Sequence, residues 1–250
     1  MAGGSRTQAG AAVIAAVLFD VDDTLVDTRG AFRHSLTSVA AAYLRTTPTP
    51  EELTLTWRTD AGGHYRAHTR GEISYREQRK RRANELHTMY DGPHLDDDAY
   101  DAWNADFEQA FRDGWRAHDD AASCLDALEA AGIAYGALSN AAVAYQEEKL
   151  AACGLARVPM LVGVDTLGFG KPDRRVFALA AERLGFAPHQ IAYVGDELDI
   201  DAVAASAAGM TGIWLDRSGD HGASAHHGVG HPDTVTRVTS LREVLAATTF

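Results

Sequence analysis

Short apolar runs that end at a polar residue alternate with amphipathic segments over much of the chain. The apolar runs cover residues 13–19, 133–138, 191–194 and 212–215, and the amphipathic segments cover residues 119–131, 143–153 and 174–184. A short, fully apolar run is typical of a strand buried on both faces. The glycine that follows each amphipathic segment is typical of a helix end. The alternation therefore predicts an α/β fold with a doubly wound parallel sheet.

One long segment departs from this alternation. Between about residues 30 and 113 the patterns predict four helices and no strand, with helix-start signals at Thr49-Pro50 and at Ser74 followed by Glu77. We therefore expect a Rossmann-like α/β core domain formed by residues 11–27 and 114–250, with an α-helical cap domain inserted at residues 28–113.

The composition is that of an ordinary globular protein. Of the 250 residues, 46% are hydrophobic and 23% are charged, and only two are cysteines. No disulfide framework is expected, so we predict a cytoplasmic protein. The longest apolar stretch near the start, residues 11–19, is too short to cross a membrane. We expect no membrane partner, and a monomer or a homodimer.

Negative charge is concentrated outside the predicted cap. The formal net charge is −12; residues 28–112 hold 12 basic and 13 acidic side chains, whereas the rest of the chain holds 11 and 22. Because affinity for nucleic acid depends on neutralising phosphates, we expect no nucleic-acid partner. An acidic core also needs a cationic group if it is to bind an anionic substrate.

The densest group of candidate catalytic residues is Asp20-Val21-Asp22-Asp23-Thr24, directly after the first apolar run. Two carboxylates this close repel each other unless a cation lies between them. If the chain leaves extended geometry after Asp20, one carboxylate could attack phosphorus while the other carries a proton. A strand end followed by an acidic turn is the alternative.

Three further groups follow strands or precede a helix. Asp196 and Asp201 come after the third apolar run, and carboxylates suit Mg²⁺, although an acidic helix start would also explain them. Lys171 could supply positive charge near these carboxylates, or be an ordinary surface residue. Ser139-Asn140, after the second run, could hold a phosphate oxygen or cap a helix.

Taken in this order, the four motifs resemble those of the haloacid dehalogenase (HAD) superfamily, subfamily I, with a C1-type helical cap. The resemblance covers nearly the whole chain. It implies a Mg²⁺-dependent phosphatase that hydrolyses a small phosphorylated metabolite through an aspartyl-phosphate intermediate. The residues that match the family motifs are Asp20, Asp22, Thr24, Ser139, Lys171, Asp196 and Asp201.

The resemblance also implies roles for these residues. Asp20 is the nucleophile, and Asp22 protonates the leaving group and later activates water. Ser139, the Asn140 amide and Lys171 bind the transferring phosphoryl group, and Lys171 balances its charge.

For the metal, the resemblance implies a site to which four residues contribute. Two other residues of these motifs differ from the family pattern. The expected contributors to the Mg²⁺ site are Asp20, Asp196, the backbone carbonyl of Asp22, and Asp201 as a direct or outer-shell ligand. Asp23 stands where many relatives have glycine, and Ile200 stands where many have asparagine.

Other chemistries of the superfamily remain as alternatives. A phosphomutase or another phosphotransferase keeps the same core residues. A dehalogenase lacks the carboxylate that is Asp22 here, and a phosphonatase needs a cap lysine for a Schiff base, whereas Lys80 lies in a basic run. A non-catalytic binding protein would be expected to lack Asp20 or Asp22.

Substrate selection is assigned to the cap. Arg66, Arg70, Arg76 and Arg79 are the candidates for contact with an anionic substrate, and a solvated helix face is the alternative. The histidine-rich loop at residues 221–231 is left without a role.

Overall fold

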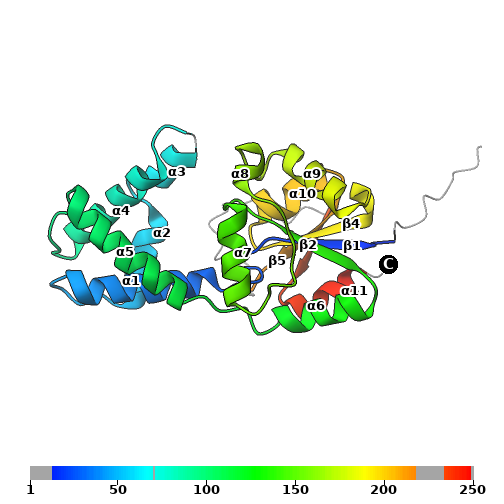
Figure 1. Cartoon of the computed structure of the whole chain (residues 1–250), viewed down its shortest axis with the longest axis horizontal. Coiled ribbons are helices and arrows are strands. Elements are labelled where there is room, and N and C mark those ends of the chain that lie inside the picture. The colour runs from blue at the N-terminus through cyan, green and yellow to red at the C-terminus, as the bar shows by residue number, and fades with distance from the viewer. Residues whose placement is uncertain (1–12, 70, 218–233, 249–250) are drawn as a thin grey trace, which may run out of the picture. The chain divides into compact units, whose positions relative to one another are not determined.

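A computed structural model describes residues 13–69, 71–217 and 234–248 (Figure 1). The backbone divides into two compact units, Met1–Asp27 with Ala117–Phe250, and Thr28–Arg116. The first unit holds a parallel sheet covered by helices, and the described residues of the second are helical apart from their connecting loops. Arg70 and the histidine-rich loop lie outside the described residues.

In the described residues, six parallel strands form one sheet in the order β3-β2-β1-β4-β5-β6. The order reverses between β1 and β4, which is the switch point of a doubly wound sheet, and ligands bind at the carboxyl ends of the strands there. The predicted fold class is therefore confirmed. The strands are β1 (Ala16–Phe19), β2 (Ala134–Leu138), β3 (Met160–Val162), β4 (Ile191–Gly195), β5 (Thr211–Leu215) and β6 (Val235–Val238).

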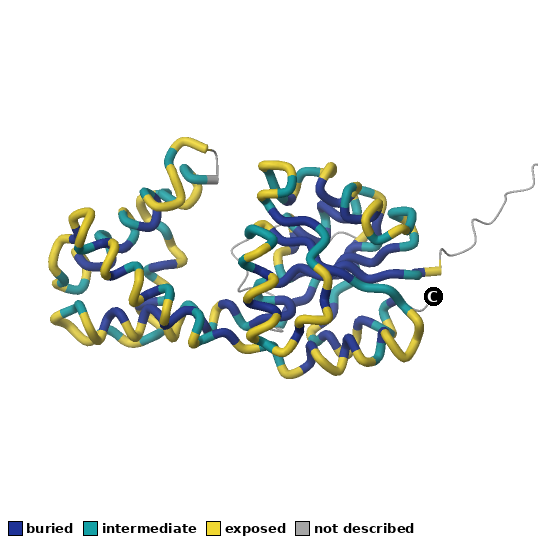
Figure 2. Tube along the Cα trace, viewed as in Figure 1, coloured by how far each residue is buried: buried dark blue, intermediate teal, exposed yellow. Residues whose placement is uncertain are grey.

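Strand β1 lies in the middle of the sheet and is buried on both faces (Figure 2). Its side chains alternate, with Val17 and Phe19 in one hydrophobic cluster and Ala16 and Leu18 in another. This alternation explains why a continuous apolar run, rather than a half-polar one, marks the strand in the sequence.

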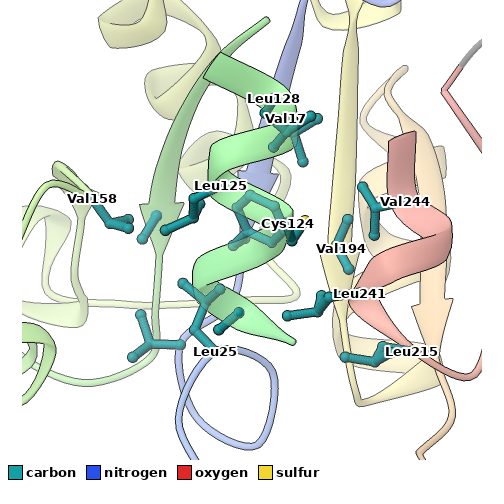
Figure 3. Packing of buried hydrophobic residues seen from close by; sticks show 14 of the residues in the cluster. Val17, Leu25, Cys124, Leu125, Leu128, Val158, Val194, Leu215, Leu241 and Val244 are labelled. Carbon is teal, nitrogen blue, oxygen red and sulfur yellow. The ribbon is translucent and has the colours of Figure 1, made fainter. Parts of the chain in front are cut away.

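Helices cover each face of the sheet. On the Val17 face, α6 and α11 contribute Leu125 and Val244 to a shared cluster (Figure 3). Leu150 of α7 belongs to the same cluster. On the opposite face, α9 and α10 contribute Phe177 and Ala205. The helices of this unit are α6 (Ala121–Ala130), α7 (Val143–Ala152), α8 (Val164–Leu167), α9 (Arg174–Leu184), α10 (Ala204–Ala207) and α11 (Val244–Ala247), with the short 3-10 helices η1 (Pro188–Gln190) and η3 (Leu241–Glu243) and the π-helix η2 (Leu198–Val203).

The strand register sets where the candidate residues lie. Phe19 pairs with Ala137 of β2 on one side and with Val194 of β4 on the other. The three central strands therefore end at nearly the same level. Asp20, Ser139 and Asp196, each just past its strand, come to the same edge of the sheet.

The second unit contains five helices in its described residues, whereas the sequence patterns predicted four. Thr49 and Glu52 form the capping box at the start of α2, and Ser74 accepts a hydrogen bond from the Glu77 amide at the start of α4, so both helix-start signals are confirmed. The additional helix, α3, has six residues and is too short for a periodic pattern. The helices are α1 (Thr28–Tyr43), α2 (Pro50–Thr59), α3 (His64–Thr69), α4 (Tyr75–Met89) and α5 (Asp97–Asp113).

Candidate active site

The chain turns sharply after β1. The amides of Leu25 and Val26 both donate to the carbonyl of Val21 at 3.0 Å, so the backbone leaves extended geometry directly after Asp20. Asp23 takes a φ of 56°, in the left-handed region. Glycine enters that region freely, and aspartate tolerates it better than most residues. The turn therefore accommodates Asp23, although it departs from the glycine of the family pattern.

Three carboxylates and one ammonium group meet at this edge of the sheet. Carboxylate oxygens of Asp20, Asp196 and Asp201 lie within 4.8 Å of one another. Lys171 Nζ lies 2.9 Å from Asp20 Oδ1 and 2.6 Å from Asp201 Oδ1. The structure thus brings together four residues that the sequence places up to 181 positions apart.

The electrostatics of this cluster favour a further cation. Burial raises the pKa of Asp20 to about 8; Lys171 opposes the rise, whereas Asp201 and Asp22 add to it. Burial alone would lower the pKa of Lys171, but Asp20 and Asp201 hold it well above its ordinary value, so the ammonium stays charged. Two of the three carboxylates, Asp20 and Asp201, pair with the Lys171 ammonium, and the oxygens of all three are the hard donors that a divalent cation prefers. The cluster could therefore hold a metal ion.

Asp201 is fully buried, and each of its oxygens is engaged. Oδ1 accepts from Lys171 and from the Tyr193 hydroxyl at 3.2 Å, and Oδ2 accepts from the Glu197 amide at 3.0 Å. A Cβ at Gly195 would lie 2.3 Å from Asp201 Cγ, so only glycine allows this close approach. The contacts indicate that Asp201 holds Lys171 in place.

The adjacent residues Ser139 and Asn140 contact different parts of the structure. The side chain of Asn140 bonds to the backbone of Lys171 and so connects the end of β2 to the loop before α9. Ser139 is 1% exposed, and its Oγ accepts from the Ala141 amide at 3.1 Å and from Gln146 Nε2 at 2.8 Å. With two donors on its oxygen, the hydroxyl keeps its own hydrogen for a third group.

Asp22 points toward α7, where two residues that the sequence interpretation missed contact it. Lys149 Nζ lies 2.6 Å from Asp22 Oδ1, and Gln146 Nε2 donates to Asp22 Oδ2 at 2.6 Å. The available signal was the spacing of Val143, Gln146 and Leu150, which places a polar residue on the apolar stripe of a helix.

The cap candidates differ in their surroundings. Arg79 is 3% exposed and lies 2.5 Å from Glu108 Oε1, so its guanidinium is paired within the helical unit. Arg76 pairs with Asp101 on α5, and Arg66 is exposed. Substrate contact by these residues stays a prediction, and Arg70 is not described.

Comparisons with known proteins agree with this geometry. The family model for haloacid dehalogenase-like hydrolases matches residues 14–209. The chain belongs to this family, and it is therefore a hydrolase. In the described residues, no helix is long and apolar enough to cross a membrane.

The similar proteins include enzymes that are named as phosphatases. The phosphoglycolate phosphatase of Escherichia coli is 27% identical, over 94% of this chain and 92% of that enzyme. The phosphoserine phosphatase of Thermus thermophilus is 38% identical, but the match covers only 46% of this chain and 45% of that enzyme.

A solved structure shares the fold. The HAD-hydrolase YfnB from Bacillus subtilis, described as bound to magnesium, has a TM-score of 0.73 and 22% identity, over 94% of this chain and 98% of that one.

Proposed function

We propose that this hydrolase is a Mg²⁺-dependent phosphatase that acts on a small phosphate monoester through an aspartyl-phosphate intermediate on Asp20. One observation carries the proposal. Asp20 lies at the end of the central strand, beside the Lys171 ammonium and within 4.8 Å of two further carboxylates. A buried carboxylate with a cationic partner is well placed to attack phosphorus, since phosphoryl transfer depends on positioning and neutralisation of charge.

Asp20 and Asp196 would hold the Mg²⁺, together with the backbone carbonyl of Asp22. The side-chain oxygens of Asp22 contact α7 instead, which leaves the carbonyl as its contribution. Asp201 would lie in the outer shell, because both of its oxygens are engaged by protein groups. When bound, Mg²⁺ would neutralise negative charge on the phosphoryl oxygens and on the nucleophile.

In the first half-reaction, a carboxylate oxygen of Asp20 attacks phosphorus, and the bond from phosphorus to the ester oxygen breaks. Asp22 donates a proton to the departing alkoxide, which leaves as an alcohol. Lys171 balances the negative charge that develops beside Asp20. Ser139 donates its hydroxyl hydrogen to a phosphoryl oxygen.

In the second half-reaction, water attacks phosphorus of the aspartyl phosphate. Asp22, now a carboxylate, accepts a proton from that water, and the bond between phosphorus and the Asp20 oxygen breaks. Inorganic phosphate leaves, and both aspartates return to their starting forms.

The relatives support a small substrate. Phosphoglycolate and phosphoserine, in their names, are phosphate monoesters with two or three carbons. We propose a substrate of this size, with the helical unit acting as the cap that selects it. The chain has two cysteines, too few for a disulfide framework, and this composition supports a cytoplasmic location.

The test is to capture the intermediate. Protein mixed with Mg²⁺ and a panel of two- and three-carbon phosphate monoesters, with sugar phosphates and p-nitrophenyl phosphate alongside, is quenched in acid and mapped by mass spectrometry. We expect phosphate release and a phosphoryl group on Asp20, and neither in Asp20→Asn. Turnover by Asp20→Asn within about tenfold of the wild-type rate would overturn the proposal, since that is only about 1.4 kcal/mol of the barrier.

A further inference from the structure

Two polar residues on the buried face of α7 have no part in the chemistry described so far. Gln146 is 0% exposed and Lys149 is 2% exposed, whereas Glu147 on the same helix faces solvent. Lys149 Nζ lies 2.6 Å from Asp22 Oδ1, and Gln146 Nε2 lies 2.6 Å from Asp22 Oδ2. Two side chains of one helix therefore hold the two oxygens of a single carboxylate.

Gln146 also reaches the phosphate-binding candidate. The same Nε2 that donates to Asp22 donates to Ser139 Oγ at 2.8 Å, and the Ala141 amide donates to that oxygen at 3.1 Å. An amide nitrogen has two hydrogens, so both bonds form at once. A single side chain thus sets the direction of the Asp22 carboxylate and of the Ser139 hydroxyl.

These buried polar groups do not favour stability in themselves. Removing an ammonium group from water is costly even when it is paired. Gln146 Oε1 is buried and has no hydrogen-bond partner among the described residues. An apolar side chain of the same length would fill the space without that unsatisfied acceptor. The geometry therefore favours a role in orientation over one in holding the fold together.

We propose that Gln146 and Lys149 are positioning residues, which fix Asp22 for proton transfer and Ser139 for binding the phosphoryl group. The inference rests on the proposed function, in which Asp22 is the acid and base. It predicts that Lys149 acts on the rate through Asp22, that Gln146 acts through both Asp22 and Ser139, and that the two residues contribute little to folding.

Kinetics of Lys149→Met and Gln146→Met test this, because methionine keeps the length and removes the hydrogen bonds. For Lys149→Met we expect kcat to fall about 100-fold on phenyl phosphate and about 10-fold on p-nitrophenyl phosphate, whose better leaving group needs less protonation. KM should change less than about twofold, since substrate binding is not altered. Lys149→Arg should recover part of the rate, and Glu147→Gln is the matched control without effect.

A double-mutant cycle separates positioning from a structural role. In an Asp22→Asn background, Lys149→Met should lower kcat by less than about threefold, because its effect passes through Asp22. The melting temperature of both methionine variants should equal or exceed that of the wild type. Equal rate losses in both backgrounds, or losses that follow the melting temperature alone, would overturn the proposal.

Crystal structures of the two methionine variants test the positioning role independently of catalytic rates. In Lys149→Met and Gln146→Met the Asp22 carboxylate should leave its wild-type rotamer or occupy several. If Asp22 and Ser139 keep their wild-type orientations in both variants, the residues do not position them. Activity retained by Asp20→Asn would instead refute the phosphatase mechanism. In that case the rotamer of Asp22 in the crystal structures would still show whether Gln146 and Lys149 position it.

Discussion

The side chain of Asn140 brackets the backbone of Lys171: its Oδ1 accepts from the Lys171 amide at 2.6 Å, and its Nδ2 donates to the Lys171 carbonyl at 3.0 Å. These bonds fix the backbone of Lys171 and thereby the position of its ammonium group beside Asp20. We expect Asn140→Ala to lower kcat about 10- to 100-fold, equivalent to about 1.4 to 2.7 kcal/mol, with the phosphorylation step most affected.

A matched variant checks this through a different residue. A Cβ at Gly170 would lie 2.2 Å from Asn140 Oδ1, so Gly170→Ala should disturb the same bracket and reproduce the loss. Rapid-quench kinetics with p-nitrophenyl phosphate measure the phosphorylation rate of Asn140→Ala, Gly170→Ala and the wild type. Wild-type phosphorylation rates in both variants would show that Lys171 does not need the bracket.

Removal of the metal should affect both rate and stability. Excess EDTA is expected to abolish turnover and to lower the melting temperature relative to Mg²⁺-saturated protein. A ligand at 100 times its dissociation constant adds about 2.7 kcal/mol to the stability of the native state. Asp196→Ala should remove the Mg²⁺ dependence of both measurements, whereas Asp199→Ala, at an exposed position, should not. Full activity in the chelator would refute the proposed metal.

Asp120 should make the core domain sensitive to acid. It is 4% exposed and accepts hydrogen bonds from Arg217, Ser240 and the Leu241 amide. Burial alone would raise its pKa, but these bonds outweigh burial and lower the pKa to about 2, from an ordinary value of 3.8. The folded-state pKa is the lower one, so this stability is fully present above pH 3.8 and is lost as the pH falls toward 2.

Urea unfolding at pH 7 and at pH 3 measures this effect. Asp120→Asn should lower the free energy of unfolding by about 1 to 3 kcal/mol at pH 7 and by less at pH 3. Asp126→Asn, on the helix α6 that Asp120 precedes, is the control, because Asp126 is 66% exposed and pairs with Arg157 at the surface. The prediction fails if the difference between Asp120→Asn and the wild type is the same at both values of pH.

We expect the cap arginines to differ in what they contribute, with Arg79 needed for stability and Arg66 for substrate affinity. Arg79 is paired with Glu108 and lies 4.3 Å over the Phe107 ring, so Arg79→Ala should destabilise the helical unit by about 3 kcal/mol. Arg66→Ala should leave the melting temperature unchanged and raise KM for the preferred substrate, with little effect on p-nitrophenyl phosphate. Arg81→Ala, which removes only an exposed pair with Glu77, is the control for stability. Equal changes on both substrates in Arg66→Ala would remove it from the substrate contacts.

The sequence patterns predicted the strands whose side chains are apolar on both faces. They missed β6, because Thr236 and Arg237 are half-buried at the edge of the sheet and interrupt the apolar run. They missed β3 because three residues are too few for a pattern. Among the described strands, both lie at the outer positions of the sheet and pair on one side, where the demand for apolar residues is weaker.

Within the site, charged residues next to strand ends could be recognised, and residues that reach in from a helix could not. Asp20 and Asp196 follow strands directly, so the register alone brings them together. Gln146 and Lys149 depend on how α7 packs, and on a helix a polar residue usually indicates a solvent-facing position. Only the tertiary structure shows that their partner is Asp22.

The ion pair between Asp22 and Lys149 joins residues 127 positions apart in the chain. Contacts of such long range form late in folding, because the entropy of closing the intervening chain opposes them until other contacts hold the ends together. The turn after β1 can form locally, but its carboxylate is oriented only after α7 has docked beside it. A chain in which α7 has not docked would therefore carry every catalytic residue and still be inactive, so the return of activity during refolding reports that α7 has reached its native position.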